Sequence, residues 1–306
     1  MGIEKIEDED YHIDFHNCNI HSCCQAALGH IAILRKYASL QRAKNNISDE
    51  LPMTARMEIK EFVKRDVKNP FIVVGFPTVG LVGAIATRYL ATSLSLELIG
   101  EILSPDLPPV TLISEGKVIP AYRVYAGNEV CGPDHKCDQL IVVTSDFPPP
   151  QNAIWPMAET ILEWSSYVKS KLVVTLEGVV YQMHQPQPQV WGVATTEQGY
   201  KVLNEHKVKP LDQGLITGLS AAILSVARGK ELDVLCLLTE AHKEIPDARA
   251  ASQLITTIGR MTPRLKIDPE PLIKEAEEIE NNMKDSLTKL ETQTKRLPEA
   301  PSRMYA

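Results

Sequence analysis

Short, continuously apolar segments recur through the middle of the sequence and alternate with segments of helical periodicity. The apolar segments are residues 71–74, 140–145, 172–176, 190–194 and 234–238. Apolar residues with helical spacing occupy residues 79–94, 154–169, 197–206, 214–227 and 246–261. Apolar strands without alternation are typical of a sheet covered on both faces, and their alternation with helices favours parallel pairing. The pattern predicts one α/β domain over residues 57–262, with three layers and a largely parallel sheet.

Shorter apolar runs and alternating segments add strands to this core. They lie at residues 96–103, 110–113 and 117–125, and the charged segment 57–68 is expected to form an edge strand or a lead-in. The sequence CGPDHKC, residues 131–137, lies between them. Its two cysteines and His135 are types that bind metals, but the tip of a hairpin is the preferred interpretation.

The hydrophobic pattern changes after residue 262. Apolar residues then recur at steps of four and three, at Leu272, Ala276, Ile279, Met283, Leu287 and Leu290. This spacing predicts an amphipathic helix of about 25 residues, or ~37 Å, within an arm of residues 263–295. Its apolar stripe must be buried on the core or on another subunit. Pro298 and Pro301 then favour an extended, flexible tail over residues 296–306, which ends in Met304, Tyr305 and Ala306.

Residues 1–56 show no strand alternation and are predicted to be a polar, poorly ordered extension with one short helix at about residues 26–42. The segment HNCNIHSCC gathers four candidate zinc ligands, Cys18, His21, Cys23 and Cys24. Their spacing fits no standard zinc site, so we expect no metal and no other cofactor.

Charge and composition exclude several classes of protein. The net charge is −7, and no stripe of lysine and arginine suggests binding to nucleic acid. No run approaches the ~18 apolar residues of a membrane span, and the acidic beginning does not resemble a secretory signal. We therefore expect a cytoplasmic protein with neither a nucleic-acid nor a membrane partner. Six cysteines do not suggest a disulfide framework, and Cys236 is expected to be a buried thiol.

The sequence FIVVGFPTVGLVG, residues 71–83, has the position of a phosphate-binding loop. A P-loop would place lysine and then serine or threonine after its second glycine, where this chain has Leu81 and Val82. A dinucleotide fingerprint would have glycine in place of Pro77. We therefore interpret the glycines as points where a helix approaches the sheet closely, with anion binding as the alternative; they are Gly75, Gly80 and Gly83.

Acidic residues follow three of the buried strands, at Asp146, Glu177 and Glu240. Ligands of α/β proteins usually bind at the carboxyl ends of parallel strands, and two nearby carboxyl groups can act as acid and base. Acids also end strands for structural reasons, and the chain has neither a Gly-x-Ser-x-Gly nor a His-Glu-x-x-His motif.

The segment 179–192 gathers apolar and aromatic residues in an expected loop. Tyr181, Met183 and Trp191 either form a protein interface or, in the case of Trp191, simply begin a buried strand.

Several segments together resemble the archaeal form of the proteasome assembly chaperone family. They are FIVVGFPTVGLVG, LIVVTS followed by prolines, TLEG after the third strand, and GLITGLSAAIL. The resemblance covers residues from about 70 to 290 and implies a fold similar to the α/β/α fold of nucleoside phosphorylases, without a recognised active site. The cysteine- and histidine-rich beginning departs from the family's pattern.

The resemblance also implies a function for the tail. Some archaeal members have a C-terminal hydrophobic-tyrosine-X motif that docks between α-subunits of the proteasome core particle, and Met304, Tyr305 and Ala306 match this motif. In that mechanism the tyrosine and the apolar residue enter a pocket, while the carboxylate of Ala306 pairs with a lysine. Homo-oligomers of this family would present several tails and so raise the effective concentration.

The resulting hypothesis is a non-catalytic proteasome assembly chaperone, or an ATP-independent adaptor or activator, acting as a homo-oligomer. The alternative is an enzyme like a nucleoside phosphorylase or a hydrolase that uses the strand-end carboxyl groups. A weaker third hypothesis is a metal-binding protein that uses residues 12–24.

Overall fold

The computed structural model describes residues 57–65, 67–180, 188–243 and 245–274. Several predicted features therefore lie outside the described residues. They are the extension 1–56, most of the C-terminal helix, the tail, and the candidate residues Cys18, His21, Cys23, Cys24, Tyr181, Met183, Met304, Tyr305 and Ala306.

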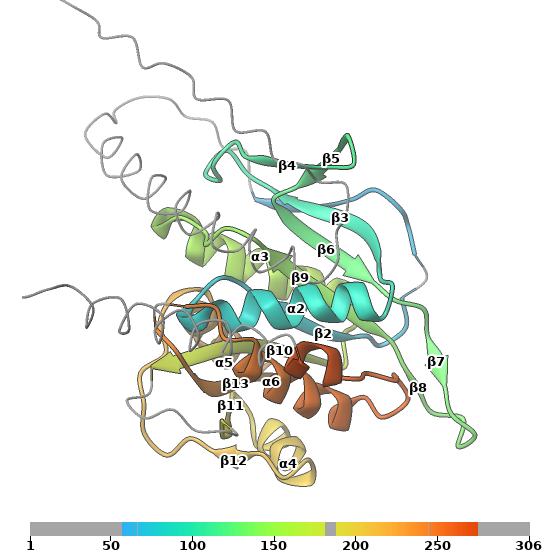
Figure 1. The fold of residues 1–306 in the computed structure, drawn as a ribbon, viewed down its shortest axis with the longest axis vertical. Coiled ribbons are helices and arrows are strands. Elements are labelled where there is room, and N and C mark those ends of the chain that lie inside the picture. Colours follow the sequence, from blue (N-terminus) through green and yellow to red (C-terminus); the bar gives the residue numbers. More distant parts are fainter. Residues whose placement is uncertain (1–56, 66, 181–187, 244, 275–306) are drawn as a thin grey trace, which may run out of the picture. The chain divides into compact units, whose positions relative to one another are not determined.

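A nine-stranded sheet forms the centre of the fold (Figure 1). Across the sheet, its strands are β1 (Glu58–Glu61), β3 (Glu97–Leu103), β6 (Tyr122–Ala126), β9 (Leu140–Ser145), β2 (Phe71–Gly75), β10 (Leu172–Val180), β13 (Val234–Ala241), β11 (Val190–Ala194) and β12 (Lys209–Pro210). The four central strands, β9, β2, β10 and β13, are parallel, as predicted. On both sides of this centre, β6 and β11 join the sheet by antiparallel pairing.

Helices cover both faces of the sheet and complete the predicted three layers. Helices α2 (Val82–Ser93) and α6 (Ala248–Met261) cover one face and lie in front of the sheet in Figure 1. Helices α3 (Ile154–Tyr167) and α5 (Gly218–Gly229) pack on the other face and on each other. Helix α4 (Glu197–Glu205) lies beside β11.

Alternate residues of the central strands point to opposite faces. In β10, Val174 and Leu176 belong to the core cluster that contains residues of α2 and α6. Thr175 and Glu177 therefore face the layer of α3 and α5. The same parity holds in β13, where Leu237 belongs to that core cluster.

The glycines of FIVVGFPTVGLVG lie where backbone segments almost touch. A Cβ atom on Gly75 would lie 2.3 Å from the carbonyl oxygen of Gly83, and one on Gly83 would lie 2.7 Å from the carbonyl oxygen of Leu176. Gly80 has a φ of 62° and faces Ala241. This region, between β2, the 3-10 helix η1 (Val79–Leu81) and α2, is the close-packed seam that the sequence suggested.

Two hairpins form separate two-stranded sheets that do not pair with the central sheet. Strands β4 (Thr111–Ser114) and β5 (Lys117–Pro120) are joined by Glu115 and Gly116, whose φ values of 51° and 72° are those of a type I′ turn. Residues 117–125 were predicted to form a strand with a hairpin; the hairpin is present at Gly116, but the segment forms two strands, because β5 ends at Pro120 and β6 begins at Tyr122. Proline has no amide hydrogen, so it interrupts the ladder at this point.

The CGPDHKC sequence forms the second hairpin, between β7 (Val130–Cys131) and β8 (Cys137–Asp138), as predicted. Cys131 and Cys137 are joined by a disulfide bond, which was not predicted from the sequence. Cys236 is a free, buried thiol, as predicted.

The beginning of the predicted C-terminal helix lies within the described residues. Residues 270–274 are helical, and the amides of Leu272 and Ile273 donate to the carbonyl oxygen of Pro269. Leu272 is buried in the core cluster together with Met261 and Leu265. The first residue of the predicted apolar stripe therefore packs on the core. Within the part of the chain that the structure describes, no helix has the length and hydrophobicity needed to cross a membrane.

Candidate functional site

The three candidate acids do not form one cluster. Asp146 follows β9, but Glu177 and Glu240 lie inside β10 and β13, which continue in register as far as the pair Val180 and Ala241. The prediction that these two acids follow their strands is therefore wrong, because pairing between β10 and β13 extends both strands beyond their apolar segments. Glu177 and Glu240 face the layer of α3 and α5, and they are two positions apart across the strand pair.

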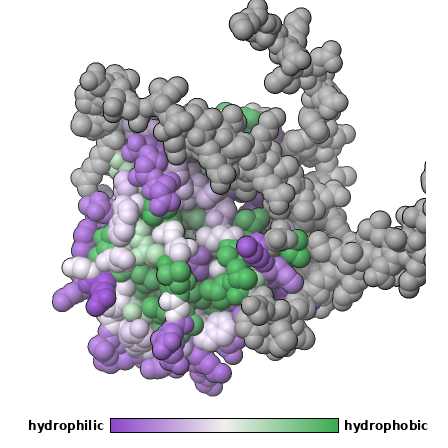
Figure 2. All heavy atoms as spheres, turned by 90° about the vertical axis from the view of Figure 1, so that its left-hand side faces the viewer, coloured by the Kyte–Doolittle hydropathy of each residue, from purple (hydrophilic) through white to green (hydrophobic). Residues whose placement is uncertain are grey.

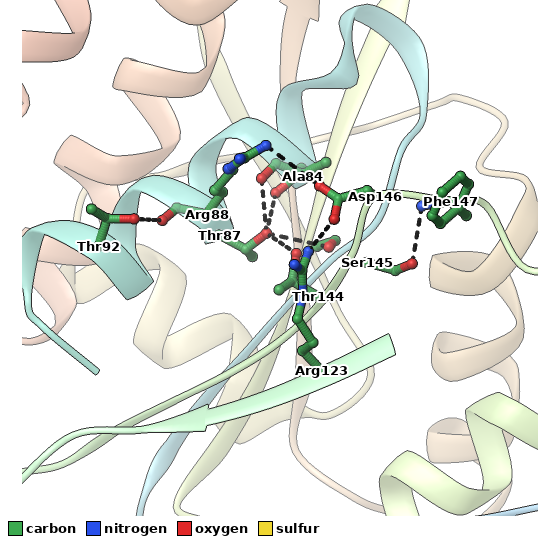
Figure 3. Close-up of polar contacts among 11 residues, drawn as sticks. Ala84, Thr87, Arg88, Thr92, Arg123, Thr144, Ser145, Asp146 and Phe147 are labelled. Carbon is green, nitrogen blue, oxygen red and sulfur yellow. Dashed lines mark hydrogen bonds and ion pairs between the residues drawn. The ribbon is translucent and has the colours of Figure 1, made fainter. Parts of the chain in front are cut away.

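Asp146 binds two arginine side chains (Figure 3). Arg123, which β6 places in the interior with 8% of its surface exposed, donates from Nη2 to Asp146 Oδ2. Arg88 Nη1 of α2 lies 3.5 Å from Asp146 Oδ1 and is half exposed. These ion pairs connect the end of β9 to β6 and α2. They give the carboxylate of Asp146 a structural role that needs no ligand.

Hydroxyl groups beside this ion pair are also satisfied (Figure 3). Thr87 Oγ1 lies 2.7 Å from Thr144 Oγ1. It is also within hydrogen-bond distance of the carbonyl oxygens of Gly83, in its own helix, and of Gly75, in β2. Since Gly75 and Gly83 bring α2 against the sheet here, the α2 face is closely packed at the carboxyl ends of β2 and β9.

The opposite face contains a cavity of about 120 Å³ at the carboxyl ends of β2, β9 and β10. Its wall is mostly apolar and is lined by Val74, Phe76, Pro77, Pro148, Pro149, Ile154, Gly218 and Leu219. Three residues contribute side-chain oxygens: Glu177, Thr78 and Ser220. This combination of an apolar wall and a few converging polar groups is typical of a small ligand site.

Glu177 is the titratable group of this cavity. It is 7% exposed, and burial raises the pKa of its carboxyl from 4.5 to about 7. Interaction with the nearby hydroxyls of Ser220 and Thr78 lowers the pKa of this carboxyl and so partly offsets the effect of burial. Thr78 Oγ1 is buried and makes no hydrogen bond of normal geometry, although it lies close enough to Glu177 to lower the pKa of that carboxyl. The hydroxyl oxygen can therefore still accept a hydrogen bond.

The first turn of α5 forms another part of the wall. Gly218 begins this helix with a φ of 72°, and Thr217 before it makes no side-chain cap. The unpaired amides at a helix N-terminus favour a negative charge nearby. The ionised form of Glu177 therefore faces the positive end of α5.

Glu240 lies one strand further along on the same face. Burial raises the pKa of its carboxyl, and a hydrogen bond with the backbone of Gln189 partly offsets this shift. Its Oε2 atom is buried without a hydrogen-bond partner. Glu240 does not line the cavity, so the structure does not bring the two glutamates together in one site.

Hydrophobic residues gather in the middle of the face that Figure 2 shows, with hydrophilic residues around them. This is the side toward which the arrow of β10 points in Figure 1, so the carboxyl ends of the parallel strands lie behind it. Trp155 at the start of α3 is 55% exposed, and Leu215, shortly before α5, is 85% exposed. The candidate interface residue Trp191 is the second residue of β11 and is partly buried.

The cysteines of the β7–β8 hairpin lie near Glu129, and these three side chains are the group within the described part of the chain whose ligand atoms are close enough for a metal ion. The disulfide occupies both sulfur atoms, however. Arg264 instead fixes this hairpin, since its guanidinium lies 2.5 Å from Asp134 Oδ2 and 3.3 Å from Asp138 Oδ2.

Sequence reasoning identified Glu177 but missed the groups around it. Thr78, Ser220 and the prolines of the cavity wall come from three separate loops and helices, and no spacing rule connects them. It also missed Arg123, although a lone arginine in the apolar strand YRVYA was a signal for a buried ion pair.

Comparison with known proteins gives consistent matches over this domain. The profile of the PAC2 family matches residues 72–287. The uncharacterized protein MJ0106 of Methanocaldococcus jannaschii is 30% identical over 233 residues, which cover 76% of this chain and 92% of that protein.

Two solved structures from Pyrococcus furiosus are similar. PbaA, described as an archaeal homolog of proteasome-assembly chaperone, has a TM-score of 0.63 and 32% identity, covering 78% of this chain and 99% of PbaA. PbaB, described as an archaeal proteasome activator, has a TM-score of 0.66 and covers 76% of this chain and 98% of PbaB. At 23% identity, the likeness to PbaB shows the fold alone.

Proposed function

The chain belongs to the PAC2 family, and on this premise we propose that it acts on the proteasome as an assembly chaperone or an ATP-independent activator. The observation that carries the proposal is the match to PbaA, which extends over 99% of that chain at 32% identity. A match of this extent includes the whole α/β/α domain, rather than one motif of it.

The proposed contact with the proteasome is made by Met304, Tyr305 and Ala306, which have the hydrophobic-tyrosine-X sequence. The tyrosine offers a large contact area with few torsions to restrain, and the carboxylate of Ala306 would pair with a lysine of an α-subunit. One such tail binds weakly. We propose a homo-oligomer in the cytoplasm whose several tails bind one α-ring together.

We further propose that this role is not catalytic. Asp146 is held by Arg123 and Arg88, so it is not available as a base. Glu240 does not line the cavity of Glu177, so this cavity does not hold a pair of carboxyl groups. The family resemblance supports the same conclusion.

A pull-down of proteasome core particles tests the proposal. Full-length protein should retain core particles, whereas deletion of residues 304–306 or Tyr305→Ala should reduce retention by at least about tenfold, the loss typical of an interface anchor. Tyr167→Ala, which removes a tyrosine that is 77% exposed on α3, is the matched control and should bind normally.

Two outcomes would contradict different parts of the proposal. Normal retention by the deletion variant would show that the tail is not the anchor. Failure of the full-length protein to bind core particles, in both the free α-ring and the assembled form, would reject the proteasome as its partner.

A further inference from the structure

The cavity beside Glu177 has the size and lining of a binding site for a short aliphatic group. Its volume of about 120 Å³ is somewhat below that of an engineered ~150 Å³ cavity that takes up benzene. The apolar wall includes Phe76, directly after β2, Ile154 of α3 and Leu219 of α5. An occupant must therefore be small and mostly apolar.

Three oxygen-bearing side chains line the cavity, and the hydroxyls of Ser220 and Thr78 lie close to the carboxyl of Glu177. Glu177 provides a carboxyl group with 7% of the residue exposed, and Ser220 and Thr78 each provide a hydroxyl. Thr78 Oγ1 is shielded from solvent and lacks a hydrogen bond of normal geometry. A buried hydroxyl oxygen that accepts no hydrogen bond favours a ligand or water that donates one, so the cavity is suited to a donor group beside Thr78 and Glu177.

The charge of the site favours a cation over an anion. The carboxyl of Glu177 lines the cavity together with the first turn of α5, so a second negative charge would be repelled there. None of the residues that line the cavity is basic. Buried carboxylates are normally paired with a cation, and the described lining of this cavity supplies none.

The arrangement does not suit a metal ion. Protein sites for divalent cations usually combine two or more carboxylate, imidazole or thiolate ligands, and Glu177 is the single residue of these types among the cavity's lining. A primary ammonium has three N–H donors and a single charge, which match two hydroxyls and one carboxylate.

We propose that this cavity binds a primary alkylammonium group, with its alkyl chain on the apolar wall and its three N–H donors on Glu177, Thr78 and Ser220. Two sources share this chemistry, a free aliphatic amine and the side chain of a lysine. In either case Glu177 is the counter-ion of the ligand, and binding releases the proton that the buried carboxyl holds at low pH. The proposal is independent of the proteasome contact, which involves another part of the chain.

The proton release gives binding a specific pH dependence. Below about pH 7 the carboxyl of Glu177 must ionise on binding, so the affinity should rise about tenfold for each pH unit between pH 5 and pH 6.5. It should become constant above pH 7.5. Two other titratable groups lie on the same face in the neighbouring strand, Cys236 and Glu240. Burial raises the pKa of the Cys236 thiol, which therefore stays neutral over this range.

The test is a titration of the full-length protein with n-butylammonium, followed by ¹³C-methyl NMR of Val74, Ile154 and Leu219, which line the cavity. The neutral analogue 1-butanol is titrated in parallel, and Nα-acetyl-lysine methylamide tests whether a lysine side chain enters the cavity. We expect butylammonium to shift these methyl signals at pH 8 and to bind at least about tenfold more weakly at pH 6.

Substitutions separate the roles of charge and hydrogen bonding. Glu177→Gln should weaken butylammonium at pH 8 at least about tenfold and abolish its pH dependence, with 1-butanol unaffected. Thr78→Val should weaken butylammonium severalfold with the pH dependence kept, which provides a second measurement if the glutamine variant is unstable. The exposed acid Glu197, on α4, is the matched control, and Glu197→Gln should bind like the wild type.

Three results would overturn the proposal: no shift of the methyl signals at pH 8, equal binding of butylammonium and 1-butanol, or unchanged binding in Glu177→Gln. Binding of the lysine derivative as tightly as butylammonium would support it and identify a peptide lysine as the source. Binding of butylammonium alone would support it with a free amine as the source.

Discussion

The two faces of the central sheet differ sharply where β2, β9 and β10 end. On the α2 face, backbone contacts at Gly75 and Gly83 leave no space, and Asp146 is paired with Arg123 and Arg88. On the face of α3 and α5, Glu177 is buried beside a cavity whose described lining holds no cation. At this edge of the sheet, one face is therefore closely packed and its acid forms ion pairs, whereas the other face has a cavity and an acid without a cation beside it.

The difference follows from side-chain parity and from what covers each face. Asp146 turns toward a helix that carries Arg88, and the adjacent strand contributes Arg123. Glu177 shares its cavity with the start of α5, which contributes the hydroxyl of Ser220 but no cation. Two acids that look alike in the sequence therefore have different roles, one in stability and one in a candidate ligand site.

The largest effect is expected for Asp146→Ala. This change leaves the guanidinium of Arg123 buried without a partner, and its Nε already lacks one. Removing one partner of a buried ion pair costs about 3–5 kcal/mol, so the free energy of unfolding should fall by about 4 kcal/mol in urea denaturation.

Arg88→Ala is the matched control on the same carboxylate. Because the Arg88 side chain is 53% exposed, its loss should cost less than about 1 kcal/mol. Equal costs for the two variants would contradict the distinction between a buried pair and a surface pair.

A smaller, pH-dependent effect is expected for Glu177→Gln. Burial raises the pKa of Glu177 to about 7 from a value of 4.5, so the folded state holds the proton more tightly than the unfolded state. This stabilisation is complete below pH 4.5 and is lost as the pH rises to about 7. At about 1.36 kcal/mol per pKa unit, the loss reaches at most about 3 kcal/mol.

The glutamine variant lacks this titration. It should match the wild type in unfolding free energy near pH 4 and exceed it by up to about 3 kcal/mol at pH 8. The measurement is a series of urea denaturation curves from pH 4 to pH 8. A constant difference across this range would show that Glu177 titrates normally and that the cavity is solvated.

The class of fold could be predicted from the sequence because the hydrophobic pattern that indicates it lies within short segments. Five apolar segments of four to six residues predicted the strands, and the parallel centre followed from their lack of alternation. The antiparallel flanks were not predicted, since pairing direction in β6 and β11 depends on contacts distant in sequence. The same reason explains why β10 and β13 continue beyond Leu176 and Leu238.

One residue of the candidate site could be predicted from the sequence, but the site itself could not. Glu177 was recognised because an acid ends an apolar run, but Asp146 and Glu240 gave the same signal. Only the register and the covering helices show that Asp146 has arginine partners and that Glu177 faces a cavity. The sequence could not show whether any two of the three acids lie together, because parity and register cannot be assigned from the sequence.

The smallest effect is expected for Gly75→Ala, on the closely packed α2 face of the sheet. A Cβ atom on Gly75 would lie 2.3 Å from the carbonyl oxygen of Gly83 and 2.5 Å from Thr87 Cγ2, so Gly75→Ala must push α2 away from β2. Overpacking of this kind costs about 1–3 kcal/mol in thermal or urea unfolding. A Cβ atom on Gly229, at the end of α5, would meet no described atom within 4 Å, so Gly229→Ala should be neutral or slightly stabilising. Normal stability of Gly75→Ala would mean that the α2 face has room at this point, and the contrast between a packed face and an open face would then disappear.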